Sequence, residues 1–331
     1  MLMRAVLQSG PGGADTLYLG ELPRPEPAPG QLLVRVMAAG VNRADIVQRE
    51  GHYPPPPGVS GVLGLEVSGV VEAVGEGASR FAKGDAVFGL VGGGGYAEYV
   101  LLDEALAIAK PAGLAWAEAA SLPEVWMTAW LNLVEVASLA AGERFLVHAG
   151  ASGVGAASIQ LARMLGADVL ASSSSDEKLE FCRALGAQTV FNARRDGAFS
   201  DRLKAAGGVD VILDPVGASY FRENLASLNT DGRLVLIGVM GGRNAELNLG
   251  LLLVKRLRVM GSTLRSQPLE VKARLAAALE GRVLPALAAG EARVTLDAVF
   301  ALAAVADAHR HVEENNNLGK VVLDLSNLMQ M

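Results

Sequence analysis

The sequence predicts an α/β protein with two domains, one of them built on a doubly wound parallel sheet, and three observations lead to this prediction. Residues 144–163 read as an apolar strand, a glycine-rich turn and a helix. Helical and strand patterns alternate from about 124 to 265, which is typical of a parallel sheet covered by helices. Residues 1 to about 123 contain short apolar segments between Gly and Pro turns, which favours a mostly-β domain.

The N-terminal stretch is expected to be mainly strand and turn. Segments 32–38, 69–74 and 96–102 are β-branched or apolar and are bounded by turn residues. Four prolines at 54–57 predict an extended, rigid loop, because proline fixes φ and donates no backbone hydrogen bond.

The middle stretch is expected to supply the parallel sheet. A helical pattern over 126–139 comes first. The strands that we expect after it are 144–148, 168–172, 189–191, 209–213 and 233–237, with helices at 153–166, 176–186 and 218–229.

The last stretch has two Ala-rich segments, 269–280 and 298–314, which we predict to be helices, and a strand at 320–325. A single strand needs a sheet to join, so we expect this one to return to the first domain. The predicted domains are therefore 1–123 with 266–331, and 124–265.

Composition favours an enzyme rather than a nucleic-acid-binding or membrane protein. The net charge is −6, whereas general nucleic-acid binding needs a basic face. No apolar run approaches the roughly 20 residues that a membrane helix needs, and no signal pattern is seen. The single cysteine, Cys182, excludes an internal disulfide and favours a reducing compartment, so we expect a cytoplasmic protein.

The glycine-rich turn predicts a dinucleotide site. Gly150, Gly153 and Gly155 follow an apolar strand and open a helix, with spacing Gly-x-x-Gly-x-Gly. Such a turn lets the backbone approach a pyrophosphate, while the free N–H groups and the helix dipole attract the anion. A glycine pattern alone is weak in a chain with 39 glycines, so the prediction depends on the flanking strand and helix.

The next strand bears on which dinucleotide binds. An acidic residue at its end would favour NAD, but this strand ends in Ser172–Ser175 with Lys178 beyond, which suits the 2′-phosphate of NADPH. The alternative is that Ser174 and Glu177 form a capping box for the following helix, and both can hold. Asp176 and Glu177 count toward NAD, although they lie about one turn late.

Several motifs make the chain resemble a known family over nearly its whole length. They are AGVNRAD at 39–45, GHYPPPP at 51–57, GLEVSG at 64–69, HAGASGVG at 148–155 and NLGKVVL at 317–323. On these motifs the chain resembles the zinc-free quinone oxidoreductase (zeta-crystallin-like) branch of the medium-chain dehydrogenase/reductase superfamily. With LIGVMGG at 236–242, the finer resemblance is to the tumour-suppressor-inducible type within that branch.

The resemblance implies a GroES-like catalytic domain built from both parts of the chain around an inserted Rossmann domain. It also implies NADPH in an interdomain cleft and a homodimer. Carried over by position, the implied contacts are Asn42 and Thr128 at the nicotinamide, Gly150, Ser152, Gly153 and Val154 at the pyrophosphate, Ser174 and Lys178 at the 2′-phosphate, and Gly238 behind the nicotinamide. The family often has a Tyr near the adenine, where this chain has Ala193.

The residues themselves argue against a metal. A catalytic zinc needs three Cys, His or carboxylate ligands, and zinc-dependent relatives carry Gly-His-Glu where this chain has Gly64-Leu65-Glu66. Leucine cannot ligate a metal, and four histidines and one cysteine are scattered along the chain. We therefore expect no metal site.

Without a metal or an evident base to hold an alkoxide, the sequence favours an acceptor that is already electrophilic. We expect NADPH-dependent reduction of a quinone, with an alkenal, enone or enoyl group as the alternative acceptor. A second alternative is an NADPH-binding structural or sensor protein.

Three residues are the candidates for catalysis, and each has an alternative role. Asn42 is expected to hydrogen-bond the nicotinamide amide or a substrate oxygen, or else to be a turn residue. Asp45 is expected to orient Asn42 or a water, or else to be a helix-start charge. Tyr53 is expected to offer its phenol to the acceptor, or else to pack on the prolines.

Three further features are better explained by structure than by chemistry. Glu66 is more plausibly part of a buried salt bridge, and His148 a packed residue with its hydrogen bonds satisfied. Trp126 and Trp130 share a helix face, which is more often a core or dimer contact than a substrate platform.

Overall fold

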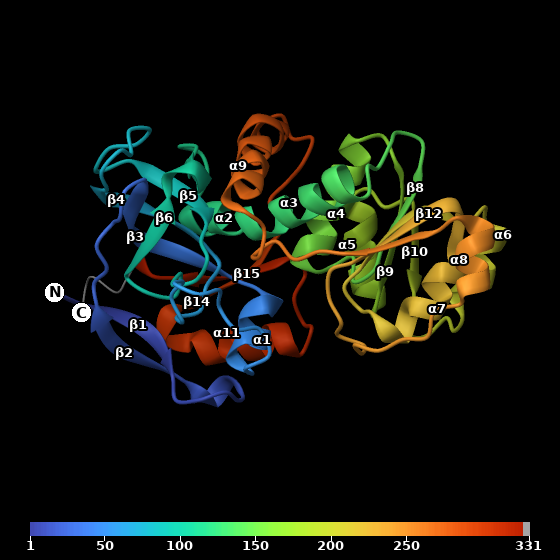
Figure 1. Ribbon diagram of the computed structural model, residues 1–331, viewed down its shortest axis with the longest axis horizontal. Helices are drawn as coiled ribbons and strands as arrows, with labels where there is room; N and C mark the ends of the chain where they lie inside the picture. The colour runs from blue at the N-terminus through green and yellow to red at the C-terminus, as the bar shows by residue number, and fades with distance from the viewer. Residues whose placement is uncertain (327–331) are drawn as a thin grey trace. The chain divides into compact units, whose positions relative to one another are not determined.

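The computed structural model describes residues 1–326, which divide into two compact units (Figure 1). Unit 1 comprises Met1–Met127 together with the chain from Arg265 onward, and unit 2 comprises Thr128–Leu264. Unit 1 combines a seven-stranded sheet and a hairpin with several helices, and unit 2 alternates strand and helix, so the predicted α/β fold class is confirmed.

Unit 1 is built on a sheet with the strand order β14-β15-β3-β4-β5-β7, in which β6 also pairs with β3. A separate hairpin joins β1 to β2. The strands are β1 (Leu2–Gln8), β2 (Leu17–Pro23), β3 (Gln31–Val41), β4 (Glu66–Val74), β5 (Ala86–Leu90), β6 (Tyr99–Asp103), β7 (Ala107–Ala109), β14 (Leu296–Ala301) and β15 (Lys320–Asp324).

The last strand of unit 1 returns to the first sheet, as the sequence predicts. Val321 of β15 pairs antiparallel with Val41 of β3, although unit 2 separates the two strands in sequence. Strand β15 therefore supplies an interior strand to a sheet that the first 127 residues leave incomplete.

The predicted helix 298–314 is wrong over its first residues. Residues Leu296–Ala301 form β14, which pairs in parallel with β15, and the helix α11 (Val305–Glu313) starts only after a short 3₁₀ turn. The physical reason is the alternation of half-buried and exposed side chains around Val299 and Phe300, which has a period of two rather than 3.6.

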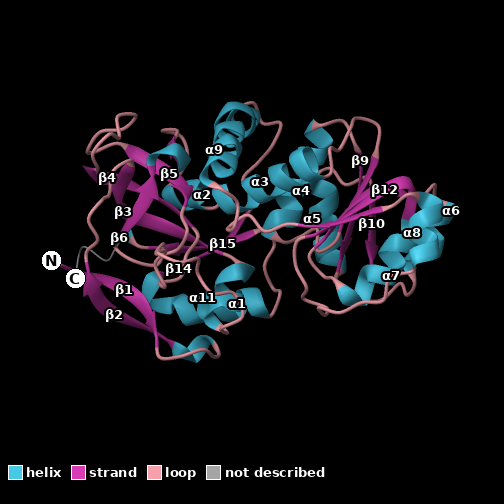
Figure 2. Cartoon of the chain, in the orientation of Figure 1, coloured by secondary structure: helices cyan, strands magenta, loops and turns pink. Residues whose placement is uncertain are grey.

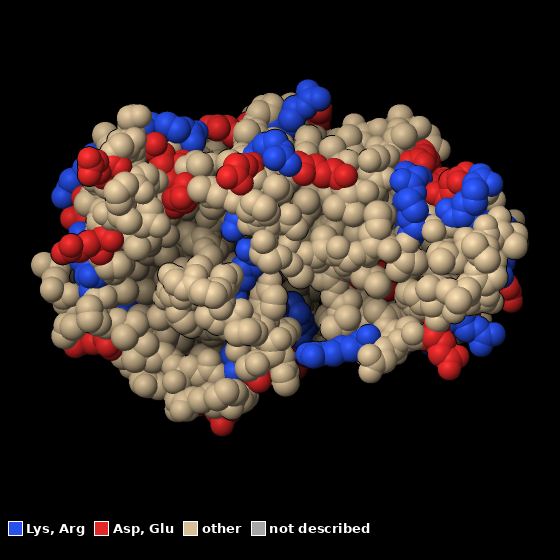
Figure 3. Space-filling model, viewed as in Figure 1, with Lys and Arg blue, Asp and Glu red and all other residues tan. Residues whose placement is uncertain are grey.

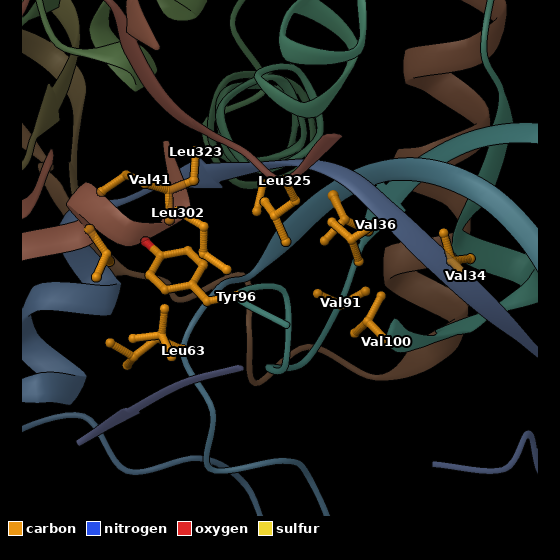
Figure 4. Packing of buried hydrophobic residues seen from close by; sticks show 14 of the residues in the cluster. Val34, Val36, Val41, Leu63, Val91, Tyr96, Val100, Leu302, Leu323 and Leu325 are labelled. Atoms are coloured by element: carbon orange, nitrogen blue, oxygen red, sulfur yellow. The ribbon is translucent and has the colours of Figure 1, made fainter. Parts of the chain in front are cut away.

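The core of unit 1 lies between its sheet and the helices that cover it (Figure 4). Tyr96 is fully buried in this core, beside aliphatic side chains from strands far apart in the chain. The helices of unit 1 are α1 (Arg43–Arg49), α2 (Trp116–Ala120), α9 (Leu269–Ala278), α10 (Leu284–Ala288) and α11.

One helix crosses from unit 1 into unit 2. Helix α3 (Pro123–Trp130) begins three residues before the predicted 126–139 helix and runs on as a π-helical segment, Leu131–Val136. A second π-helical segment, Leu279–Val283, follows α9.

Unit 2 is a six-stranded parallel sheet with the order β10-β9-β8-β11-β12-β13. Its strands are β8 (Arg144–Val147), β9 (Asp168–Ser173), β10 (Thr189–Asn192), β11 (Val209–Asp214), β12 (Leu228–Leu236) and β13 (Arg258–Gly261). Its other helices are α4 (Gly153–Met164), α5 (Asp176–Leu185), α6 (Phe199–Ala205), α7 (Ala218–Ser227) and α8 (Leu249–Lys255). Helices α6 and α8 and strand β13 were not among the predicted elements.

Helices lie on both faces of the sheet in unit 2 (Figure 2). The chain runs outward from β8 to β9 and β10 on one side, and continues from β11 on the other. The strand order therefore reverses between β8 and β11, and ligands of such sheets bind at the carboxyl ends of the strands beside that reversal.

The surface charges are mixed in sign. Lys and Arg side chains are interspersed with Asp and Glu on the face seen in Figure 3, as a net charge of −6 suggests. Within residues 1–326, none of the helices combines the length and apolar character that crossing a bilayer requires.

Candidate functional site

The glycine-rich turn of unit 2 joins β8 to α4 at the reversal of strand order. Ser152 is the N-cap of α4, and its Oγ accepts a hydrogen bond from the backbone N–H of Gly155 at 3.1 Å. This cap fixes the first helical turn, and it leaves the N–H groups of Gly153 and Val154 at the helix start, where an anion is stabilised.

Two glycines of this turn have no room for a side chain. A Cβ on Gly150 would lie 2.8 Å from Sγ of Cys182, and one on Gly155 would lie 2.4 Å from the carbonyl oxygen of Ala149. The backbone of Ala149 is itself left-handed, with φ of 52°. The turn is therefore packed tightly from below by α5, and its geometry suits a pyrophosphate group.

A row of buried, hydrogen-bonded side chains supports the glycine-rich turn from beneath. His148 Nε2 lies 2.7 Å from Oδ1 of Asn224, whose Nδ2 donates to Asp214 at 2.9 Å. Because that oxygen must accept, Nε2 of His148 carries the proton and Nδ1 accepts from the Ser172 hydroxyl at 2.6 Å. The prediction that His148 is packed and satisfied is confirmed, and burial lowers its pKa to about 4.

The same network of hydrogen bonds extends to β11, on the other side of the point where the strand order reverses. The carboxylate of Asp214 accepts from the backbone N–H groups of Val216 and Gly217, at 2.6 and 3.2 Å. Gly238 lies against this loop, since a Cβ there would be 2.7 Å from the carbonyl oxygen of Pro215. One network of hydrogen bonds therefore connects the carboxyl ends of strands β8, β9 and β11.

The end of β9 carries the residues expected at the 2′-phosphate. Ser174 is exposed and its carbonyl accepts from Nδ2 of Asn192 at 3.1 Å, while Lys178 is half-buried in the first turn of α5. Asp176, which counted toward NAD, is paired with Arg195 at 2.8 Å. Its carboxylate is therefore neutralised by a partner of its own.

The capping box expected at Ser174 and Glu177 is wrong by one residue. Ser175 is the N-cap of α5, and its Oγ accepts from the backbone N–H of Lys178 at 3.3 Å. Since Ser175 is already in the extended backbone conformation that a cap needs, the hydroxyl of Ser174 is not used as the cap.

In unit 1, the predicted Asn42 belongs to a buried triad. Its Nδ2 donates to Oε1 of Glu66 at 2.9 Å, and its Oδ1 accepts from Nζ of Lys320 at 2.7 Å. Lys320 is also paired with Glu66 at 2.6 Å, and all three side chains are at most 9% exposed. The carboxylate and the ammonium fix the orientation of the amide, because each offers only one kind of hydrogen-bond partner.

The salt bridge expected for Glu66 is confirmed, and a glycine makes room for it. A Cβ on Gly40 would lie 2.1 Å from Oε1 of Glu66. The other oxygen, Oε2, accepts from the backbone N–H of Glu124 at 2.8 Å. Strands β3, β4 and β15 and helix α3 therefore meet at this carboxylate.

Asp45 lies at the start of a helix and is hydrogen-bonded to Asn42. It lies in the first turn of α1 and accepts from the backbone N–H of Asn42 at 2.8 Å, so it holds that residue in place. It also accepts from the N–H of Gly64 at 2.9 Å and from the hydroxyl of Tyr96 at 3.2 Å. Burial raises the pKa of Asp45 to about 6, although these hydrogen bonds act in the opposite direction.

The hydrogen bonds around Asp45 continue through Tyr96 to helix α11 of unit 1. Nη1 of Arg49 lies 3.2 Å from Nδ1 of His309, whose Nε2 lies 3.3 Å from the hydroxyl of Tyr96. Arg49 can only donate, so His309 accepts at Nδ1 and donates at Nε2. Burial lowers the pKa of His309 to about 3, so the ring is neutral at physiological pH.

The ring of Tyr53 lies against the side chain of Arg265. The guanidinium carbon of Arg265 lies 5.4 Å from the centre of the Tyr53 ring, in a cation–π arrangement. Arg265 is buried and donates from Nε to the carbonyl oxygen of Gly92 at 2.9 Å and from Nη1 to Oε1 of Gln48 at 2.7 Å.

Glu124 is a further titratable group of unit 1. Burial, reinforced by the nearby charge of Glu66, raises the pKa of its carboxyl to about 8. It is therefore mostly protonated at neutral pH and able to donate a hydrogen bond.

The side chains of Leu65 and Glu66 do not form a donor set that fits a zinc ion. Leu65 is buried, and Glu66 is used by Lys320 and Asn42. Throughout residues 1–326, no three His, Cys, Asp or Glu side chains gather as metal ligands do.

Trp126, Trp130 and Thr128 are the remaining residues that the sequence singles out. Trp126 is buried on α3, and Trp130 one turn later is partly exposed, in line with a packing role for this face. The carbonyl oxygen of Thr128 accepts from Nδ2 of Asn132 at 2.8 Å within unit 2.

Sequence reasoning missed Lys320, Glu124 and Arg265. A signal existed for Lys320, because it is a lone cation at the start of an apolar strand, inside a motif already noted. None existed for Glu124 and Arg265, whose surroundings come from segments distant in sequence.

Comparisons with known proteins agree with this architecture. Residues 28–112 match the family described as alcohol dehydrogenase GroES-like domain, and residues 153–280 match the family described as zinc-binding dehydrogenase. The chain is similar to the quinone oxidoreductase of Lama guanicoe, at 34% identity over 327 residues that cover 97% of each protein.

Solved structures are similar over almost the whole chain. One is an NAD-dependent alcohol dehydrogenase, with a TM-score of 0.86 and 34% identity over 98% of this chain and all of the other. Another is mycobacterial Rv1454c complexed with NADPH, with a TM-score of 0.87 and 31% identity over 97% of this chain and 99% of the other.

Proposed function

The chain is an oxidoreductase of the medium-chain dehydrogenase/reductase superfamily, and from that premise we propose that it reduces quinones with NADPH and without zinc. The choice of acceptor depends on one observation, which is the set of side chains that unit 1 offers as possible metal ligands. Leu65 stands at a zinc-ligand position, and the neighbouring carboxylate of Glu66 is held by Lys320. Such a donor set would not hold a Lewis acid for an alkoxide, whereas a quinone accepts a hydride with little assistance.

The proposed cofactor fits unit 2. The pyrophosphate would be held by the turn at Gly150 and by Ser152, Gly153 and Val154 at the start of α4, where the backbone approaches closely. Bound NADPH would supply the hydride. The proposed nicotinamide neighbours are Asn42, Thr128 and Gly238.

The preference for NADPH over NADH is proposed for the end of β9. The exposed hydroxyl of Ser174 and the ammonium of Lys178 would contact the 2′-phosphate, while the carboxylate of Asp176 is occupied by Arg195. A carboxylate free to bond the ribose hydroxyls would favour NAD instead.

Asn42 and Asp45 are proposed to act as a pair. Glu66 and Lys320 use one hydrogen and one lone pair of the Asn42 amide, which leaves the second Nδ2 hydrogen for a carbonyl oxygen of the nicotinamide or acceptor. Asp45 is proposed as a positioning residue, because it holds the backbone of Asn42. Tyr53, kept in place by Arg265, is proposed to offer its ring or phenol to the acceptor.

We also propose that the protein is a cytoplasmic homodimer. Leu249, Leu253 and Val254 of α8 are 62%, 76% and 80% exposed, which is unusual for adjacent aliphatic residues. Strand β13 is at the edge of the sheet of unit 2, where a second copy could continue the hydrogen bonding. The single buried thiol, Cys182, suits a reducing compartment.

The test is NADPH oxidation with 1,2-naphthoquinone, followed by absorbance, run beside NADH and beside a 2-alkenal. We expect turnover that is selective for NADPH and faster with the quinone. The Gly155→Ala variant serves as a control without a working phosphate turn.

The other outcomes are equally informative. Faster turnover of the 2-alkenal would replace the quinone by an enone as the acceptor class. Tight NADPH binding without turnover of either acceptor would contradict the enzyme proposal and favour a structural or sensor role.

A further inference from the structure

Four buried side chains of unit 1 form a row of hydrogen bonds that ends at Asp45. The row runs from Arg49 of α1 through His309 of α11 and Tyr96 to Asp45. Each of these residues is 0% exposed, and Tyr96 lies among aliphatic side chains (Figure 4). Polar groups are costly to bury, and apolar residues could fill the same space. The row therefore calls for a role beyond packing.

The direction of the hydrogen bonds is fixed at the Arg49 end. Its Nε donates to the carbonyl oxygen of Gly12 at 2.9 Å, and its Nη2 is paired with Glu313. Nη1 lies 3.2 Å from Nδ1 of His309, which must accept because a guanidinium only donates. Nε2 of His309 then carries the proton and donates to the Tyr96 oxygen at 3.3 Å. The hydrogen of the Tyr96 hydroxyl is left for Oδ2 of Asp45, at 3.2 Å.

Asp45 receives donors from every side. Besides the Tyr96 hydroxyl, the backbone N–H groups of Asn42 and Gly64 donate to it at 2.8 and 2.9 Å. A carboxylate accepts all three hydrogen bonds, whereas a carboxylic acid would have a hydrogen that none of these partners can accept. Burial acts against the charge and raises the pKa of Asp45 to about 6, so the ionised form has only a small margin at neutral pH.

We propose that Tyr96 and His309 are positioning residues, which keep Asp45 ionised so that it holds Asn42 in place for the nicotinamide or acceptor. A carboxylate is the stronger acceptor for the backbone N–H of Asn42, so protonation of Asp45 would loosen that residue. The inference rests on the proposed function, because the contact of Asn42 with nicotinamide or acceptor belongs to it.

Other charged groups also act on this part of unit 1. The ammonium of Lys320 favours the ionised form of Asp45. The remaining groups whose charges act on Asp45 or Tyr96 are Glu66, Glu124, Arg265 and Arg49. Tyr96→Phe leaves all of them in the protein and removes only one hydroxyl, so its effect on Asp45 isolates the hydrogen bond.

The first test needs no turnover. It is a ¹³C NMR titration of the full chain, labelled at the aspartate carboxyl carbon and free of nucleotide, with the Asp45 signal assigned by Asp45→Asn. We expect Tyr96→Phe to raise the pKa of Asp45 from about 6 by at least about one unit, because a hydrogen bond to the charged form is lost. An unchanged Asp45 pKa in Tyr96→Phe would overturn the proposal.

Two controls accompany this titration. Tyr18→Phe removes the hydroxyl of a tyrosine that is 50% exposed on β2, and should leave the pKa of Asp45 unchanged. Asp214 of unit 2 is an internal reference, because burial also raises its pKa to about 6. A shift of Asp214 as large as that of Asp45 in Tyr96→Phe would contradict a specific effect of the hydroxyl.

The second test is the pH profile of kcat for reduction of 1,2-naphthoquinone by NADPH. If Tyr96→Phe raises the pKa of Asp45 by one unit, kcat should fall about fivefold at pH 6 and stay within about twofold of wild type at pH 9. An equal loss at all pH values would indicate a merely structural role and contradict the proposal. Wild-type protein without turnover would overturn the proposed function instead, and the NMR titration would still decide whether Tyr96 controls Asp45.

His309 provides an independent pair of variants, which also serves if Tyr96→Phe fails to fold. His309→Leu removes the donor to Tyr96, and we expect it to raise the pKa of Asp45 by about half a unit. His309→Gln retains one acceptor and one donor on the same side chain and should restore a pKa close to that of wild type. The same Asp45 pKa in the Leu and Gln variants would contradict the role of His309.

Discussion

Nζ of Lys320 lies 2.6 Å from Oε1 of Glu66, in an ion pair that joins β15 to β4 inside unit 1. Both side chains are almost fully buried, and Asn42 bonds to each of them. The pair thus fixes the amide that we propose to contact the nicotinamide or acceptor.

Removal of one member of this pair should destabilise the protein strongly. Lys320→Met leaves the buried carboxylate of Glu66 without its cation, at a cost of about 3–5 kcal/mol in the free energy of unfolding. The double variant Lys320→Met/Glu66→Gln should recover part of the loss. Urea denaturation measures both, with the exposed Arg310→Gln as a control expected within about 0.5 kcal/mol of wild type. Equal effects of Lys320→Met and Arg310→Gln would contradict the buried-pair assignment.

A side chain at Gly150 should disrupt the phosphate turn. The added Cβ of Gly150→Ala would meet Sγ of Cys182 at 2.8 Å, so the turn must shift away from the start of α4. We expect NADPH affinity to fall at least about tenfold, measured by nucleotide fluorescence. Gly113→Ala, where a Cβ meets no atom within 4 Å, is the matched control. Restoration by the added variant Cys182→Ala would establish the steric cause, and unchanged affinity in Gly150→Ala would argue against a pyrophosphate at this turn.

Lys178 should distinguish the two dinucleotides. If its ammonium contacts the 2′-phosphate, Lys178→Ala should weaken NADPH binding by about 10- to 100-fold and NADH binding by less than about twofold. Lys204→Ala changes a surface lysine on α6 and serves as the control. Equal losses for both nucleotides would rule out the 2′-phosphate role.

His148 should contribute to acid sensitivity. Burial depresses its pKa from 6.5 to about 4, so its stabilising effect is complete above pH 6.5 and is lost as pH falls toward 4. The shift of about 2.5 units corresponds to on the order of 3 kcal/mol. In His148→Gln this part of the pH dependence should disappear, while the contribution of His309 remains. Urea denaturation at pH 7 and pH 4 gives the comparison; parallel losses in variant and wild type would show that His148 is not the group involved.

The exposed face of α8 should control self-association. Leu253→Lys places a charge at a position that is 76% exposed, so it should not affect the fold but should weaken the proposed dimer at least about tenfold. Light scattering during size-exclusion chromatography measures the mass, with the exposed Leu269→Lys of unit 1 as control. A dimer that survives Leu253→Lys would place the interface elsewhere, and a monomeric wild type would exclude it.

The sequence predicts those parts of the structure whose signals are local. Strand β8, its glycine turn and helix α4 lie within about 20 consecutive residues, and each carries its own pattern of glycine or apolar spacing. The return of β15 was predictable because an apolar strand cannot remain unpaired. Strand β14 was mistaken for helix, since its alanines suit either state and its pairing with β15 decides between them.

The candidate site was only partly predictable for the same reason. The role of Asp45 as a helix-start charge follows from its place three residues after Asn42. The approach of Lys320 to Asn42, and of Arg265 to Tyr53, depends on pairings across the fold that no spacing in the chain reveals. The raised pKa of Glu124 follows from burial, which a sequence does not display.

The position of β15 in the chain also sets an order for events during synthesis. Unit 2 is continuous in sequence, from Thr128 to Leu264, so all of its strands have left the ribosome while Lys320 has yet to be added. Until then β3 lacks one neighbour and Glu66 lacks its cation. A nascent chain can therefore acquire its nucleotide-binding unit first, and the unit that we propose to receive the acceptor is completed only afterwards.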